Sequence, residues 1–245
     1  MKRGTAARRA FGAGLVAACL VMAGAGLARA GTAPTFVSIA KPAEGARVLV
    51  VKPEATLNML TAGGAQEPKD AWSQSAQKYL DASLDSAVRA RKLTPLDADP
   101  DAYDDPRAVQ MLKLNDAVTQ SIALNALPYA KLPTKTGFDW TLGEDVAALL
   151  PAAPTDGAQT APAYALFVKA AGSYSSGGRA AVMVGMAMLG VGMPMGGQYM
   201  QGTLVDLKTG QVVWYQTLIV PSGTDIRTAE GAGAAVDKLL AKLPL

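Results

Sequence analysis

Residues 198–220, QYMQGTLVDLKTGQVVWYQTLIV, contain the clearest secondary-structure pattern of the chain. Two apolar runs rich in β-branched residues flank a short polar stretch, Lys208 to Gly210. Asp206 stands before this stretch and Gly210 closes it, as the turn of a short hairpin requires, because glycine tolerates a left-handed backbone. The pattern therefore predicts a β-hairpin with strands at 198–207 and 211–220.

The remaining elements are predicted outward from this hairpin. Short apolar runs typical of buried strands occupy 47–52 and 164–168, and we expect the glycines of 172–178 to end the second run. Pro95 confines a further strand, 93–96, to a sheet edge. Apolar residues spaced by three and four predict helices at 70–92, 106–127, 142–150 and 228–243. This order predicts one α/β (α+β) domain over residues 46–245, with a mixed sheet of four or five strands covered by helices.

The first 30 residues have the features of an export signal. Basic residues stand at the N-terminus, residues 10–28 carry no charge, and Ala28-Arg29-Ala30 fits a cleavage site. Cleavage there would leave residues 31–45 as a tether. A second processing route is open, because residues 16–19 fit a bacterial lipobox that would leave Cys19 lipidated. Both routes predict an exported protein, in the periplasm or anchored to the outer membrane.

Composition excludes several classes of chemistry. The sequence has no histidine and a single cysteine, Cys19, so Ser-His-Asp catalysis, Cys-His catalysis and histidine-ligated zinc are ruled out. The leader holds five of the 23 basic residues and none of the 20 acidic ones, which leaves the rest of the chain with a net charge of −2. We therefore expect no nucleic-acid partner.

Residues 180–195, AAVMVGMAMLGVGMPM, contain no charge and no side chain that forms ordinary hydrogen bonds. Three interpretations are open: a buried core element, an apolar insertion (180–196) that contacts a protein or a membrane surface, and a Cu(I) site. The copper interpretation would use the thioethers of Met183, Met186, Met188, Met193 and Met195. The predicted contact residues are Met183, Met186, Met188, Leu189, Met193, Met195 and Tyr199.

Three smaller motifs suggest other chemistry. Ser75 and Lys78 fit the S-x-x-K motif of serine hydrolases, with Lys-Thr-Gly at 135–137 and 208–210. Asp97, Asp99 and Asp101 resemble the start of a calcium loop, although its later positions do not fit. Asp139, Glu144 and Asp145 stand near Trp140, as in a carbohydrate site. In the same order, the ordinary interpretations are a solvent-exposed helix face, a solvated acidic loop, and a core tryptophan beside the start of a helix.

The late part of the chain resembles a known family. Asp206, Thr209, Gly210 and Trp214 form the phrase D-x-x-T-G-x-x-x-W, followed by residues 225–228, DIRT, and an amphipathic helix. This pattern is similar to bacterial envelope proteins with a CsgG-like or TolB N-terminal-like domain. The resemblance implies a non-catalytic protein without cofactors. It also implies other envelope proteins, further copies of itself or a membrane surface as partners.

Overall fold

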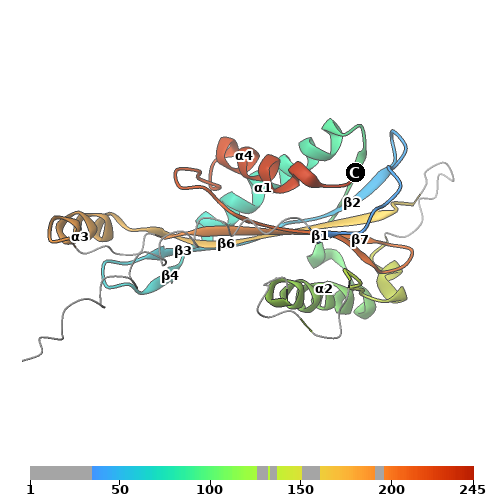
Figure 1. Cartoon of the computed structure of the whole chain (residues 1–245), viewed down its shortest axis with the longest axis horizontal. Coiled ribbons are helices and arrows are strands. Elements are labelled where there is room, and N and C mark those ends of the chain that lie inside the picture. Colours follow the sequence, from blue (N-terminus) through green and yellow to red (C-terminus); the bar gives the residue numbers. More distant parts are fainter. Residues whose placement is uncertain (1–34, 126–131, 133–136, 151–160, 191–195) are drawn as a thin grey trace, which may run out of the picture. The chain divides into compact units, whose positions relative to one another are not determined.

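The computed structural model describes residues 35–125, 132, 137–150, 161–190 and 196–245. The chain divides into two units, Met1–Ala30 and Gly31–Leu245, and all described residues belong to the second. This unit combines a mixed β-sheet with helices on both faces (Figure 1). The predicted α/β class and the mixed sheet are therefore confirmed.

The sheet has eight strands rather than the four or five predicted, counted over the described residues. Its main order is β1-β8-β7-β6-β2-β5, with β3 also paired to β6 and β4 paired to β3. β2 pairs in parallel with β5 and β6, and β3 in parallel with β6, whereas the other pairs are antiparallel. The strands are β1 (Thr35–Phe36), β2 (Arg47–Val51), β3 (Glu54–Leu60), β4 (Gln66–Pro68), β5 (Thr94–Ala98), β6 (Tyr164–Ser175), β7 (Gln198–Asp206) and β8 (Val212–Ile219).

The predicted end of the 164–168 strand is wrong, because β6 continues through Gly172 to Ser175. Its first half pairs with β2, its second half with β3, and β7 runs along its other edge. A Cβ on Gly172 would overlap the carbonyl oxygen of Gly197. The glycine is therefore required by the close approach of a neighbouring segment and does not break the strand.

Helices cover the two faces of the sheet (Figure 1). α1 (Asp70–Ala90) and α4 (Ala229–Leu239) pack over one core, and α2 (Pro106–Asn125) with the 3-10 helix η2 (Glu144–Leu149) packs over the other. Side chains alternate between these cores along each strand, as in Leu166 and Phe167 of β6. Two further 3-10 turns, η1 (Pro100–Ala102) and η3 (Leu240–Lys242), complete these layers, and α3 (Gly177–Met188) follows β6.

The hairpin turn and the start of the last helix agree with the sequence prediction. The amide of Gly231 donates to the Thr228 hydroxyl at the start of α4, at 3.1 Å. Gly210 has a φ of +72° in the hairpin turn, as its position predicted. The predicted edge strand is β5, which has a partner only in β2 among the described strands.

Candidate interaction surface

The α3 arm, defined as residues 176–190, leaves the sheet after β6 and precedes β7. Its base is fixed to the end of β3, because the Ser176 amide donates to the Leu60 carbonyl oxygen at 2.9 Å. The Ser176 hydroxyl in turn accepts from the Arg179 amide at 3.1 Å and caps the helix. Figure 1 shows α3 at the end of the sheet where β3 and β4 lie.

Arg179 is the single charged residue of α3, and it is turned into the base of the arm. Its side chain is buried, and one guanidinium nitrogen, Nη1, donates to the carbonyl oxygen of Thr61 at 3.4 Å. The rest of the arm therefore presents no charge to its surroundings.

The arm is exposed around most of its circumference. Met188 is 83% exposed, Leu189 76%, Val184 59% and Val182 41%. Seven residues make about two helical turns, so Val182 and Leu189 share one side, and Val184 and Met188 lie about 100–160° around the helix from them. Met183 and Met186 are half-buried. For the described residues 180–190, the interpretation as a buried core element is therefore wrong.

The predicted contact residues are only partly brought together. Met183, Met186, Met188 and Leu189 belong to the α3 arm, and Met193 and Met195 lie outside the described residues. Tyr199 stands at the start of β7, where it pairs with Ile219 of β8, and both side chains are exposed. Ile219 was missed, because only the strand register shows that it neighbours Tyr199.

The positions of the methionines on α3 limit which thioethers could bind Cu(I) together. Met183 and Met186 are three residues apart and share a helix face, whereas Met188 lies well around the helix from Met183. The described part of the segment thus offers two thioethers on a common face. Cu(I) binding stays an untested prediction.

Ser75 and Lys78 form no visible catalytic pair. The Ser75 hydroxyl donates to the Ala71 carbonyl oxygen of its own helix at 2.8 Å, and Lys78 lies over the ring of Tyr79. Among the described residues no hydrogen bond joins Ser75 to Lys78. One of the Lys-Thr-Gly stretches, 208–210, is the turn between β7 and β8, and most of the other lies outside the described residues.

Residues of the acidic stretch 97–105, Tyr103 among them, line a pocket of about 390 Å³ together with Leu150. Asp99 accepts from the Lys52 ammonium at 3.0 Å, and this hydrogen bond lowers the pKa of Asp99. Asp105 accepts from the Arg107 amide near the start of α2. Within the described ranges, no three or more His, Cys, Asp or Glu side chains are grouped to hold a metal ion.

Trp140 packs against the core on the α2 side, and Glu144 and Asp145 form the first turn of η2. These positions agree with the ordinary interpretation of a core tryptophan beside a helix start.

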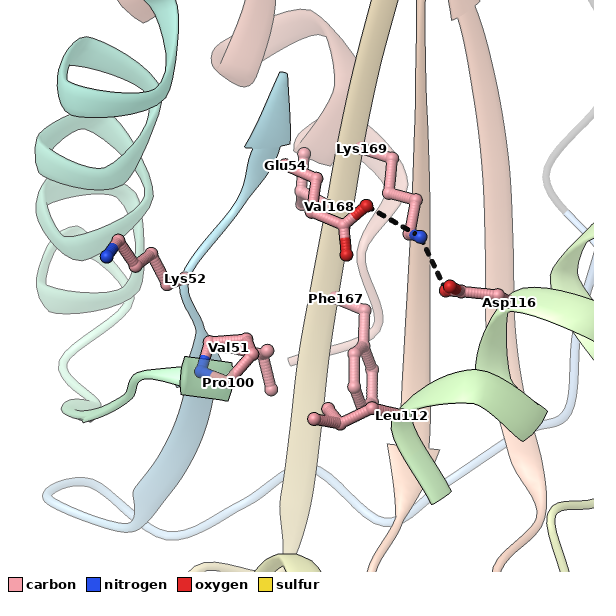
Figure 2. Close-up of a pocket in the computed structure, with 9 residues that line it drawn as sticks. All are labelled: Val51, Lys52, Glu54, Pro100, Leu112, Asp116, Phe167, Val168 and Lys169. Carbon is pink, nitrogen blue, oxygen red and sulfur yellow. Dashed lines mark ion pairs between the residues drawn. The ribbon is translucent and has the colours of Figure 1, made fainter. Parts of the chain in front are cut away.

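A small pocket of about 30 Å³, with room for about one water molecule, lies between β2, β6 and α2. Figure 2 shows the residues that line it. The Lys169 ammonium of β6 lies 2.5 Å from Asp116 of α2 and 2.9 Å from Glu54 of β3. These two carboxylates raise the pKa of Lys169 although burial opposes the shift. The ion pairs attach α2 to the sheet, and sequence reasoning did not identify them.

A second cluster, the Arg227 clamp, consists of Trp72, Tyr174, Asp225 and Arg227. The guanidinium of Arg227 donates to both carboxylate oxygens of Asp225, at 2.9 and 2.8 Å, and lies 3.7 Å from the ring centre of Tyr174 and 4.5 Å from that of Trp72. The Tyr174 hydroxyl donates to Asp225 at 2.9 Å. Burial, and then this hydrogen bond, raise the pKa of Tyr174. The DIRT stretch thus ties the start of α4 to α1 and β6.

No protein-family model matches the sequence, and no match was found among curated proteins. Three solved structures show distant likenesses. A Helicobacter pylori protein described as a neuraminyllactose-binding hemagglutinin homologue has 9% identity and a TM-score of 0.39, with 85% of this chain and 92% of that chain covered. The PelC dodecamer from Paraburkholderia phytofirmans has 16% identity and a TM-score of 0.34, with 87% and 98% covered.

The C-terminal domain of LpoB from Salmonella enterica has 17% identity and a TM-score of 0.27, with 75% of this chain and 88% of that chain covered. At TM-scores this low, the likenesses carry no argument about this chain. The resemblance to CsgG-like and TolB N-terminal-like domains therefore stays a prediction.

Proposed function

We propose that this protein is an exported, non-enzymatic accessory protein of the bacterial envelope that acts by contact through the α3 arm. The exposure of Val182, Val184, Met188 and Leu189 in one continuous element carries the proposal. Contiguous apolar surface of this kind marks interaction sites in soluble domains, because water does not favour it. The leader, residues 1–30, supports export.

The location is tested by the intact mass of the processed protein from soluble and membrane fractions. A species that begins at Gly31 indicates a free periplasmic protein, and one with acyl chains on Cys19 indicates an anchored lipoprotein. A chain that keeps residues 1–30 and stays in the cytoplasm would contradict export.

The contact is tested by a photo-crosslinking amino acid placed at position 189 in living cells. Position 120 is the matched control, because Gln120 is an exposed residue of a second helix, α2. We expect crosslinked adducts at 189 and none at 120. Equal yields at the two positions would show that the α3 arm makes no specific contact.

A further inference from the structure

The α3 arm lacks a polar face, and this limits what can cover it. A helix that docks in a groove of another protein keeps polar side chains toward water on its outer side. No side chain between Ala180 and Leu189 can ionise or form an ordinary hydrogen bond. The exposed side chains of Val182, Val184, Met188 and Leu189 spread over about 160° of the helix, and the remaining side, which carries Met183 and Met186, is apolar as well. The surroundings that match such a helix best are therefore apolar on every side of it.

The length of the helix fits one leaflet of a bilayer. The 12 residues of α3 extend about 18 Å at ~1.5 Å per residue. The hydrocarbon core of a bilayer is about 30 Å thick, so one leaflet contributes about 15 Å. The helix is therefore too short to span a membrane and long enough to enter one leaflet. No helix in the described part of the chain has both the length and the apolar character needed to span a bilayer.

The base of the arm has the polarity that a headgroup region requires. The exposed strand β4 and the segment before α1 lie at this end, and Glu67 pairs with Lys69 at 3.4 Å. Arg179 is buried in the base. Because these charges are paired or buried, attraction to anionic lipids is not expected to drive binding.

Building on the proposed function, we infer that the partner of the α3 arm is the acyl region of one bilayer leaflet, recognised by hydrophobic burial and not by lipid charge. The arm would enter with its tip, Met188 and Leu189, deepest and with Arg179 and β4 at the headgroups.

The experiment uses the processed protein recovered from cells, carrying Leu189→Cys labelled with an environment-sensitive fluorophore. The introduced thiol is the one free thiol in either processing route, because Cys19 is removed with the leader or acylated. The protein is mixed with vesicles of phosphatidylcholine, and with vesicles that also contain phosphatidylglycerol. We expect a blue shift and quenching by acyl-chain spin labels in both. The same label on Gln120→Cys should stay in water.

Val184→Asp with Met188→Asp, which leaves the labelled position itself unchanged, should weaken partitioning by roughly 100-fold or more, because an ionised aspartate is costly in hydrocarbon. Gln120→Asp adds the same charge on α2 and should change nothing. A binding step that required phosphatidylglycerol would overturn the inference, because the arm offers no charge to recognise it.

A label that stays in water with both vesicle types would also overturn the leaflet inference. Crosslinking at 189 in cells then separates the two proposals. Adducts with another protein, or between copies of this chain, would leave the proposed function standing with a protein partner. No adducts together with a water-exposed label would refute both proposals.

Discussion

Replacement of Arg227 by alanine should destabilise the protein by about 2 kcal/mol. The change removes two hydrogen bonds to the Asp225 carboxylate and two contacts of the guanidinium with aromatic rings. Hydrogen bonds to charged groups contribute about 1.5–3 kcal/mol when buried, and an exposed cation–π contact about 0.5–1 kcal/mol. The Arg227 and Asp225 side chains keep 26% and 35% of their surface exposed, so solvent screening reduces the sum to about 2 kcal/mol.

The assay is urea unfolding of the processed protein at neutral pH, followed by tryptophan fluorescence. Arg89→Ala is the matched control, because Arg89 also pairs with an aspartate, at 3.8 Å, but is 64% exposed. The control should lose no more than about 0.5 kcal/mol. If Arg227→Ala were no more destabilising than Arg89→Ala, the clamp would not hold α4 in place and the reasoning would fail.

The same clamp predicts a dependence on pH. Hydrogen bonding by Arg227 lowers the pKa of Asp225 from 3.8 to about 2. A carboxyl group with a lower pKa in the folded state stabilises the protein above its unfolded pKa, and this contribution is lost as pH falls through the folded pKa. The stability difference between wild type and Arg227→Ala should therefore shrink between about pH 4 and pH 2. A difference that stayed constant over this range would contradict the assignment.

Three further perturbations test the core and the arm. Met188→Asp with Leu189→Asp should change the free energy of unfolding by less than about 1 kcal/mol, because both side chains are exposed; unfolding of this variant would place the arm in the core. Gly202→Ala should lower stability by roughly 1–3 kcal/mol, since its Cβ would lie 2.9 Å from the Trp214 ring, and an unchanged melting temperature would show that the ring can move. Lys169→Met removes the cation between two carboxylates, and hydrogen exchange should then become faster in α2; unchanged protection would show that the ion pairs do not hold this helix.

Local signals in the sequence were sufficient for the hairpin and for the start of α4. The turn at Asp206–Gly210 and the cap at Thr228 depend on residues within four positions of each other, and the structure confirms the predicted turn and the predicted helix start at 228. The edge position of β5 also followed from one residue, Pro95. Such features depend on backbone geometry that a residue determines for itself and its neighbours.

Features that depend on distant partners could not be predicted. β3 was missed because its residues, EATLNML, alternate only weakly in polarity and are held by pairing with β6 and β4. Gly172 was predicted to end a strand, but it is a glycine because the backbone at Gly197 passes too close for a side chain. The Arg227 clamp joins residues from α1, β6 and the start of α4, and no spacing in the sequence indicates that they meet.

The two cores explain how the protein can present an apolar helix without depending on it for stability. The buried halves of β6 and β7 pack between α1, α4 and α2, and their other ends extend to the base of the arm. Because Arg179 is the one buried residue of α3, this helix contributes little to the free energy of folding. Its exposed apolar surface lowers the solubility of the protein. A segment that costs solubility and contributes little to stability is best explained by what it contacts. Substitutions in the cores should therefore change stability, whereas substitutions in the arm should change binding alone.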